Sequence, residues 1–262
     1  MSQFKYIKYS EENRTATISM NRPELYNALN FDAKMEIVQA IREANKSPSV
    51  FSIILTGEGK AFCTGQDLND RSVQVGNGGV DLGHTLQTEW NPLVTAIRDS
   101  KKIVIAAVNG VCAGAGISVA IACDLIVSKP GVKFIGAFSK LGLAPDAGST
   151  YIFSRALGYQ KTMEFFLLGE AITTDELHTA GLINALSDDP MAKAMEYSQS
   201  LNKLSPLASS MIKANIKAAL DSNFTASMER EMHVQRFLGR SADYKEGLTA
   251  FLEKRQPNFT GN

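Results

Sequence analysis

The chain has 262 residues, enough for one large domain with a substantial core or for one domain with an appendage. Its 27 basic and 27 acidic residues give no net charge, so no overall positive field favours binding to nucleic acid or to an anionic membrane. Three cysteines and three histidines, scattered without metal-ligand spacing, predict neither a disulfide framework nor a metal site.

Targeting signals are not evident in the sequence. The N-terminal segment has no apolar run of the kind that a signal peptide needs. No stretch approaches the roughly 20 apolar residues of a membrane-spanning helix. We therefore expect a cytoplasmic protein with reduced cysteines and with no membrane or nucleic-acid partner.

Strands are the first elements that the sequence predicts. Residues 15–20 alternate polar and apolar side chains, which is typical of a half-buried strand. Residues 50–55 and 103–108 are short runs of mostly apolar residues, many of them β-branched, as in the buried strands of parallel sheets. A shorter apolar run at 124–127 leads into a Lys-Pro-Gly turn.

A helix is predicted between the first two of these strands. Asn30 is placed as its N-cap, and Phe31, Met35, Val38 and Ile41 recur along one face. Strands that alternate with helices over the first 150 residues predict an α/β fold.

The character of the chain changes after about residue 151, where helical stretches follow one another. Thr173 and Glu176 have the spacing of a capping box, and Gly181 is placed as a helix stop. The glycine-rich stretch 75–79 predicts a flexible loop, and His84 after it is expected to be a solvated histidine. The helices are predicted at roughly 159–168, 174–181, 190–203, 207–220, 224–238 and 243–255.

Two glycine-containing loops each join a buried strand to an expected helix. They are residues 57–67 and 109–116. Ligands of α/β sheets bind beyond the carboxyl ends of strands, and glycine lets backbone N–H groups approach a ligand closely. Two such loops from adjacent strands would direct two donors at one oxygen, which is the arrangement of an oxyanion hole. Each loop taken alone is explained better as a tight turn in which glycine serves packing.

Nucleotide-binding motifs are only partly matched. Gly114-Ala115-Gly116 is similar to part of the dinucleotide fingerprint, but Val119 stands where its third glycine would be, and no acidic residue follows about 20 residues on. The phosphate-binding pattern that ends in Gly-Lys-Ser/Thr is absent from the sequence.

Asp146 precedes a predicted helix and has two interpretations. The commoner role of an Asp in this position is to cap the helix N-terminus. The alternative is a carboxylate at the edge of a pocket, available for proton transfer.

Taken together, these segments resemble the enoyl-CoA hydratase/isomerase family, also called the crotonase superfamily. The resemblance extends over nearly the whole chain and rests on the order and spacing of six short motifs. They are Asn21–Glu24, Asn27–Leu29, Lys60–Leu68, Ala107–Gly110, Gly114–Gly116 and Ala122–Asp124.

The family resemblance implies a spiral core of ββα units, with a C-terminal helical region that builds trimers or dimers of trimers. We place the core with its acyl-CoA site at 1–200 and the helical trimerisation region at 201–262. The substrate implied is a coenzyme A thioester, so coenzyme A enters as part of the substrate and no separate cofactor is expected.

Site residues follow from the same resemblance. The two N–H donors to the thioester carbonyl correspond to Gln66 and Ala115. The residues that correspond to the binding site for the substrate and its coenzyme A are Ala61, Cys63, Thr64, Gly65, Asp67, Leu68, Gly114, Phe138 and Leu141.

Departures from the family pattern narrow the chemistry. Family members that add water to an enoyl thioester carry two glutamates, and here Ser118 and Phe138 stand at those positions. Neither side chain acts as a general base near neutral pH. Asp146 corresponds to the position where some isomerases of the family carry a catalytic Asp. An isomerase with Asp146 as its single acid and base is therefore predicted.

Within the family, the chain resembles the members that convert the ring 1,2-epoxide of phenylacetyl-CoA to an oxepin-CoA. The similar segments are Gly65–Arg71, Ala137–Asp146 and Gly239–Gly247. That resemblance implies ring-epoxide isomerisation, double-bond shifts in related enoyl-CoA thioesters, or both. Three alternatives stay open: an enoyl-CoA hydratase, a dehalogenase-like enzyme with Asp146 as nucleophile, and a non-catalytic acyl-CoA-binding protein.

Overall fold

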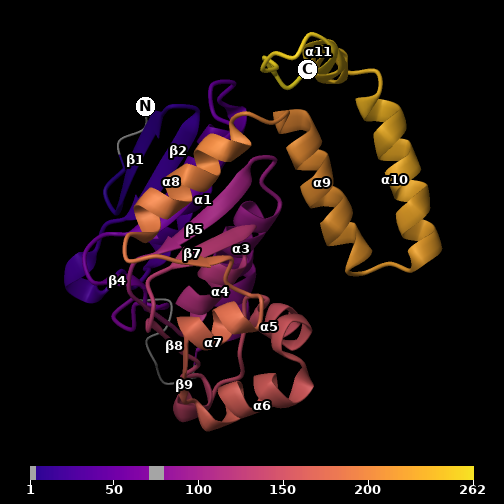
Figure 1. The fold of residues 1–262 in the computed structure, drawn as a ribbon. Coiled ribbons are helices and arrows are strands. Elements are labelled where there is room, and N and C mark those ends of the chain that lie inside the picture. Colours follow the sequence, from indigo (N-terminus) through magenta and orange to yellow (C-terminus); the bar gives the residue numbers. More distant parts are fainter. Residues whose placement is uncertain (1–3, 71–79) are drawn as a thin grey trace.

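Two sheets form the centre of the computed structural model, which describes residues 4–70 and 80–262 (Figure 1). The glycine-rich stretch 75–79 lies outside the described residues. The larger sheet has the order β1 (Ile7–Glu12), β2 (Thr15–Met20), β3 (Ser52–Gly57), β5 (Ile103–Val108), β7 (Leu125–Ser128) and β10 (Ala185–Leu186). The smaller sheet has the order β4 (Ala61–Cys63), β6 (Val111–Ala113), β8 (Lys133–Ile135) and β9 (Ala171–Thr173).

The central strands of the larger sheet are apolar because helices cover both of their faces. β3, β5 and β7 pair in parallel, and Ile53 and Ile54 on adjacent positions of β3 are both fully buried. One face packs against α1 (Phe31–Lys46), while the other packs against α8 (Pro190–Leu201), which crosses it in Figure 1. The Asn30 side chain accepts a hydrogen bond from the N–H of Ala33, so the predicted N-cap of α1 is confirmed.

A repeated unit builds the two sheets together. A long strand of the larger sheet is followed by a three-residue strand of the smaller sheet and then by helix, as in β3-β4, β5-β6 and β7-β8. The helices of the three units are α3 (Asn91–Arg98), α4 (Ala115–Ile121) and α5 (Ser149–Leu157). The predicted spiral of ββα units is therefore confirmed.

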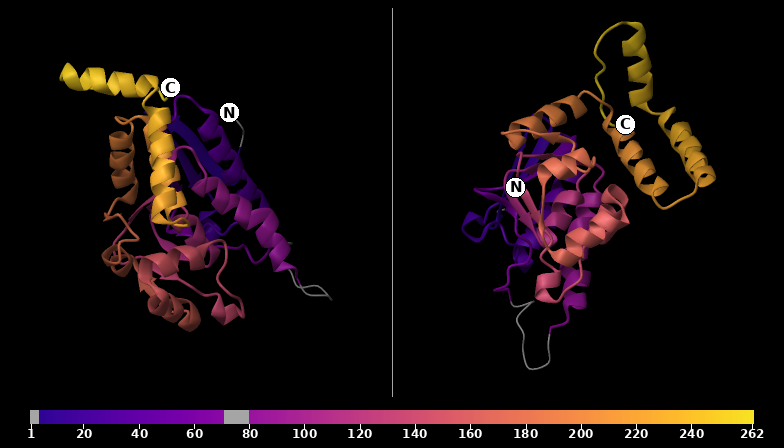
Figure 2. Two further views of the ribbon diagram at one scale, coloured as in Figure 1. Left: turned by 90° about the vertical axis from the view of Figure 1, so that its right-hand side faces the viewer. Right: turned by 60° about the horizontal axis from the view of Figure 1, so that its bottom comes forward.

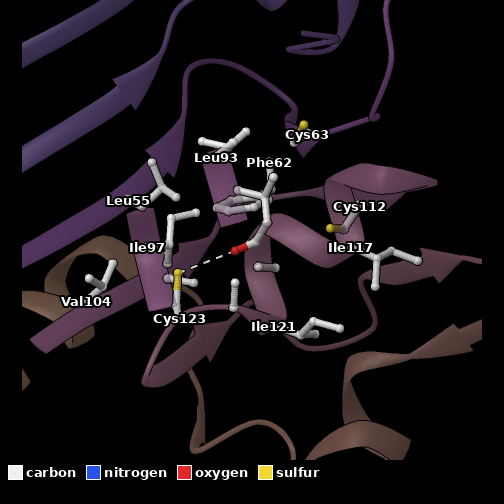
Figure 3. Close-up of a cluster of buried hydrophobic side chains, with 14 of the residues drawn as sticks. Leu55, Phe62, Cys63, Leu93, Ile97, Val104, Cys112, Ile117, Ile121 and Cys123 are labelled. Atoms are coloured by element: carbon white, nitrogen blue, oxygen red, sulfur yellow. Dashed lines mark hydrogen bonds between the residues drawn. The ribbon is translucent and has the colours of Figure 1, made fainter. Parts of the chain in front are cut away.

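Side chains of both sheets meet the helices of these units in one core (Figure 3). Leu55 of β3, Phe62 of β4 and Ile97 of α3 are buried in this cluster. The three cysteines of the chain are buried here as free thiols, and burial raises the pKa of Cys63 to about 12. A thiol with such a pKa is a packing group, because the reactive thiolate is not populated near neutral pH.

The remaining helices of the α/β body lie around these units. The turn before α3 consists of α2 (Leu82–Thr85) and a π-helical turn (Leu86–Trp90), and two 3-10 turns occupy Pro23–Leu25 and Ser139–Leu141. α6 (Tyr159–Leu168) and α7 (Thr174–Thr179) follow α5. Thr173 and Glu176 form both hydrogen bonds of the predicted capping box at the start of α7.

Three helices follow at the C-terminus: α9 (Pro206–Ala219), α10 (Phe224–Leu238) and α11 (Ala242–Leu252). Figure 1 and the right-hand view of Figure 2 show α10 and α11 standing apart from the sheets, whereas α9 contacts β5 and places Lys213 against the α/β body. No residue of α10 is buried, although Phe224, Met228 and Phe237 are large apolar side chains. Among the helices of residues 4–70 and 80–262, none combines the length and apolarity required to cross a membrane.

Candidate active site

The two glycine loops singled out in the sequence lie against each other. Because β4 and β6 pair in parallel, the segments that follow them leave the smaller sheet at the same edge. A Cβ atom on Gly65 would lie 3.0 Å from the backbone nitrogen of Ala115, and one on Gly116 would lie 2.3 Å from the carbonyl oxygen of Cys63. Glycine at these positions is therefore required by the close approach of the loops, and not by turn geometry alone.

The N–H of Ala115 is directed by the backbone. Gly114 has φ +51° and ψ −135°, a conformation that only glycine adopts without strain. Ala115 is the first residue of α4, so its N–H belongs to the first turn and has no acceptor within the helix. This N–H is available to a ligand oxygen.

The N–H of Gln66 is placed by a one-residue parallel bridge to Leu29. The N–H of Leu29 donates to the carbonyl of Gly65 at 2.8 Å, and the N–H of Asp67 donates to the carbonyl of Leu29 at 3.0 Å. In such a bridge the residue between the two bonded groups directs its own N–H to the opposite side. Asp67 is held further by Arg22, 2.8 Å away; burial raises the pKa of this carboxyl, but the hydrogen bond from the N–H of Asn69 and then the contact with Arg22 outweigh it and keep the pKa below its usual range.

A cavity of about 410 Å³ lies where these loops meet α2, the π-helical turn and the segment around Asp146. Its wall is mostly apolar, and the exposed side chains of Leu68, Leu141 and Leu143 form part of it. An apolar cavity with a few polar groups is typical of a small-molecule site. The lining residues are Thr64, Gln66, Leu68, Leu82, Thr85, Leu86, Trp90, Ala113, Gly114, Ala115, Ala137, Phe138, Leu141, Leu143 and Asp146.

Asp146 does not cap a helix with its side chain, so that interpretation of the sequence is wrong. The N-cap residue of α5 is Gly148, and it is the backbone carbonyl of Asp146 that accepts bonds from the N–H and hydroxyl of Ser149, at 3.0 and 2.8 Å. Ala147 and Gly148 both have left-handed backbone conformations, with φ of +48° and +83°. This turn separates Asp146 from the helix and frees its carboxyl group for the cavity.

The side chain of Asp146 is partly exposed, but the Oδ1 atom of its carboxyl group is buried. Within the described residues its Oδ1 atom has no hydrogen-bond partner. Burial alone raises the pKa of Asp146 to about 6, since an ionised carboxylate is costly away from water. A carboxyl group with a pKa near 6 exchanges a proton readily at neutral pH.

The two positions that correspond to the glutamates of hydratases carry no acidic or basic side chain. Ser118 is fully buried in α4, and its hydroxyl donates to the carbonyl oxygen of Asp146 at 3.1 Å. Phe138 lies in the cavity wall and packs edge-on against Phe166, with ring centroids 6.1 Å apart. Ser118 therefore supports the backbone of the Asp146 turn, and Phe138 contributes an apolar surface.

The predicted binding residues divide into two groups. Thr64, Leu68, Gly114, Phe138 and Leu141 line the cavity, together with the predicted donors and Asp146. The other four lie behind its wall, where they shape the loops: Ala61, Cys63, Gly65 and Asp67.

Sequence reasoning missed Leu82, Thr85 and Leu86, which form part of the cavity wall. The polar contacts of Trp90 were also not anticipated, and His84 is exposed and does not line the cavity. The spacing of Leu82, Leu86, Trp90 and Leu93 is helical and contained the signal for this element. In the described part of the chain, no cluster of His, Cys, Asp and Glu side chains could hold a metal ion.

A spiral of ββα units with an apolar cavity among its loops defines the class of protein, and comparison with known proteins agrees. The chain belongs to the enoyl-CoA hydratase/isomerase family, which matches residues 10–262. It is therefore an enzyme of the crotonase superfamily.

Some relatives of the chain are named isomerases and others are named hydratases. The 1,2-epoxyphenylacetyl-CoA isomerase of Escherichia coli strain K12 is 36% identical over 98% of this chain and 99% of its own length. A probable enoyl-CoA hydratase of Rhodobacter capsulatus is 37% identical over 97% of this chain and 98% of its own. The crystal structure of an enoyl-CoA hydratase from Polaromonas sp. JS666 superposes with a TM-score of 0.90 at 30% identity, covering 97% of this chain and 99% of that one.

Proposed function

We propose that the protein is an acyl-CoA isomerase in which Asp146 transfers the proton and the N–H groups of Gln66 and Ala115 bind the thioester oxygen. The observation that carries the proposal is the Asp146 carboxyl group, with a buried Oδ1 atom and a raised pKa, in the wall of the same cavity as both Gln66 and Ala115. Neither Ser118 nor Phe138 offers a second carboxylate to activate water.

The reaction follows from these three groups. Two hydrogen bonds to the thioester oxygen draw electrons from the acyl chain and acidify its C–H bonds. The Asp146 carboxylate takes one such proton, and the negative charge passes to the oxygen, where the two N–H groups stabilise it. The carboxylic acid then returns the proton to a different carbon, so that the product has the composition of the substrate.

As substrates we propose the ring 1,2-epoxide of phenylacetyl-CoA, converted to an oxepin-CoA, together with enoyl-CoA thioesters whose double bond shifts. The support is the identity to the Escherichia coli isomerase and the apolar cavity wall, which includes the aromatic rings of Trp90 and Phe138. In the phenylacetyl group, the methylene beside the thioester carbonyl carries the acidified protons. One proton moves from it to a ring carbon, and the carbon–carbon bond shared by the epoxide and the ring breaks, which expands the ring to the seven-membered oxepin without a change of composition.

A mass-spectrometric assay of the Asp146→Asn variant tests the proposal. The purified protein is incubated with the ring epoxide, with 3-enoyl-CoA and with 2-enoyl-CoA thioesters. Isomerisation leaves the mass unchanged and alters the retention time, whereas hydration adds one water. We expect the wild type to isomerise and the variant to lose at least about 1000-fold in kcat, because its amide cannot accept the proton. Exposed Asp188, replaced by Asn, is the matched control and should keep full activity.

The pH dependence of stability and activity gives a second test. The folded-state pKa of Asp146, about 6, lies above the value near 3.9 of an unfolded Asp, so the folded state binds the proton more tightly. Its contribution to stability is present below about pH 4 and is lost as the pH rises through 6. At pH 7 the Asn variant should be more stable than the wild type by on the order of 2–3 kcal/mol in urea unfolding, and at pH 4 by nearly nothing. Over the same interval kcat/KM of the wild type should rise with pH, and a pH-independent kcat/KM would contradict the assignment.

Hydration of enoyl-CoA is the second candidate, because relatives of similar identity are named hydratases. It would need water held by Ser118 or by the backbone in place of the two glutamates. Rapid addition of water to crotonyl-CoA by the wild type would favour it over isomerisation.

We propose further that the C-terminal helices form the interface of a homotrimer or a dimer of trimers. The support is the row of exposed apolar side chains on α9, α10 and α11, among them Ile216, Phe224, Phe237 and Phe251. Light scattering of the purified protein would give three or six times the chain mass of 28.4 kDa, and a monomer would refute the proposal.

A further inference from the structure

A buried ion pair lies directly behind the cavity, and the proposed reaction does not use it. Lys34 of α1 and Glu89 of the π-helical turn form a salt bridge in which the side chain of Lys34 is fully buried and that of Glu89 is 6% exposed. Burial lowers the pKa of Lys34, and the hydrogen bond to Glu89 opposes this shift. Removing two charges from water is costly, and a pair of apolar side chains is often at least as stable. Stability alone therefore does not explain why a buried ion pair is present here.

The contacts of the pair point to Gln66. The Nζ atom of Lys34 donates to the side-chain oxygen of Gln66 at 2.9 Å, and the indole N–H of Trp90 donates to the same oxygen at 2.9 Å. The amide nitrogen of Gln66 donates to the carbonyl of Asp67 at 3.1 Å. Lys34 also lies 4.8 Å from the centroid of the Trp90 ring. All polar atoms of the Gln66 side chain are thus engaged, from three directions.

We infer that Lys34, held by Glu89, is a positioning residue that fixes Gln66 and thereby aims its backbone N–H at the thioester oxygen. This inference rests on the proposed function, because it assigns a role to the support of one oxyanion-hole donor. Among the residues that the structure describes, the backbone on either side of Gln66 is bonded to Leu29, on one face of the loop. The side-chain bonds from Lys34 and Trp90 supply the remaining restraint on its rotation.

A second buried ion pair in the same molecule shows what a purely structural pair looks like. Lys213 of α9 lies 2.7 Å from Asp124, and its Nζ atom also donates to the carbonyls of Ile97 and Lys102. Asp124 in turn accepts from the N–H of Val104. None of these residues lines the cavity. Lys213→Met is therefore a matched control for substitutions at Lys34.

The experiment measures carbonyl polarisation directly. Hexanoyl-CoA labelled with ¹³C at the thioester carbonyl has no double bond and is neither isomerised nor hydrated. Isotope-edited infrared spectra of the bound thioester report how strongly the two N–H groups polarise it, because hydrogen bonding lowers the carbonyl stretching frequency. The variants are Lys34→Met/Glu89→Gln, which removes both charges together, and the control Lys213→Met.

We expect the wild type to lower the carbonyl frequency, and the Lys34→Met/Glu89→Gln variant to lose at least about half of that lowering. Its kcat should fall about 10- to 100-fold with little change in KM, since small displacements of a catalytic donor have effects of this size. Lys213→Met should keep both the frequency and kcat. An unchanged frequency in a folded Lys34→Met/Glu89→Gln variant would overturn the inference. If the wild type itself fails to lower the frequency, the oxyanion hole is refuted, and the inference fails with it.

Gln66→Met keeps the test decisive if the charge-neutralised variant does not fold. This substitution leaves the ion pair and the backbone N–H in place and removes the side-chain bonds of Gln66 to Lys34, to Trp90 and to the carbonyl of Asp67. We expect the same loss of carbonyl polarisation, and in the Gln66→Met background the Lys34→Met/Glu89→Gln change should cause no further loss. Full polarisation in Gln66→Met would overturn the inference.

Discussion

The two proposed oxyanion-hole donors are placed by different means. The N–H of Ala115 is set by backbone alone, through the glycine conformation at Gly114 and the close contact of Gly116 with β4. The N–H of Gln66 is set by side chains, through Lys34 and Trp90, in addition to a single backbone bridge.

The difference predicts how each loop responds to substitution. Where the loop position depends on glycine, substitution has an all-or-none effect, because an added Cβ atom either fits or displaces the loop. A backbone held by several side-chain bonds loses its restraint in steps, one bond at a time. The effects should therefore be largest at the glycines and smallest at a single side-chain donor.

The largest effect is expected from Gly116→Ala. Its Cβ atom would lie 2.3 Å from the carbonyl oxygen of Cys63, so β4 and α4 must separate. We expect a loss of about 3 kcal/mol in stability by urea unfolding, and more than about 100-fold in kcat. Gly131→Ala is the control: a Cβ there meets nothing within 4 Å, so its left-handed φ of +67° should cost stability alone, by about 1–2 kcal/mol, and full activity should remain. Unchanged stability of Gly116→Ala would show that the loops are not in forced contact.

A smaller effect is expected from Gly114→Ala. A Cβ atom there has room, with its nearest neighbour 3.8 Å away, so the cost is conformational and amounts to about 1–3 kcal/mol. Relaxation of the strained backbone would rotate the N–H of Ala115, and kcat should fall about 10-fold or more. Gly158 also has a positive φ, with φ +77° and ψ 169°, precedes a helix as Gly114 does, and lies outside the cavity. Gly158→Ala should lose stability without a fall in kcat. If Gly114→Ala and Gly158→Ala had equal kcat, the backbone conformation of Gly114 would not set the N–H of Ala115.

The smallest effect is expected from Trp90→Phe. Phenylalanine keeps an apolar ring in the cavity wall but removes one of the two donors to the side-chain oxygen of Gln66. One neutral hydrogen bond is worth about 1 kcal/mol, so kcat should fall roughly 3- to 10-fold in steady-state assays. The same substitution in the Gln66→Met background should leave kcat unchanged relative to Gln66→Met alone. If kcat fell as far as in Gly116→Ala, the side-chain bonds of Gln66 would not contribute separately to its restraint.

Long, regular elements could be predicted from the sequence, and short ones could not. The strands at 15–20 and 103–108 and the helices at 159–168 and 224–238 have the predicted bounds. The strand predicted at 50–55 lies two residues later, at Ser52–Gly57. The smaller sheet was missed because strands of three residues, such as Ala61–Cys63, are too short to show an alternation of side chains.

The candidate site was predictable where local sequence determines it. The glycine loops could be recognised from their composition, but the choice between packing turns and paired N–H donors depended on family resemblance. The capping role given to Asp146 was wrong because two left-handed residues intervene before α5, and Ala147 gives no sign of such a conformation. The Lys34–Glu89–Gln66 cluster joins residues 32 and 55 positions apart, and no spacing rule connects them.

The π-helical turn at Leu86–Trp90 has a consequence for chain length. The N–H of Asn91 donates to the carbonyl of Leu86, five residues back, so this turn contains one residue more than an α-helical turn. Deleting one residue within 86–88 would restore α-helical spacing. The helix on one side of the deletion would then rotate relative to the other side. Either the residues before the deletion change their orientation, or Glu89 and Trp90 no longer face Lys34. The support of Gln66 thus depends on the number of residues in this turn as well as on their identity, and an alignment that closed a gap here would misplace both side chains.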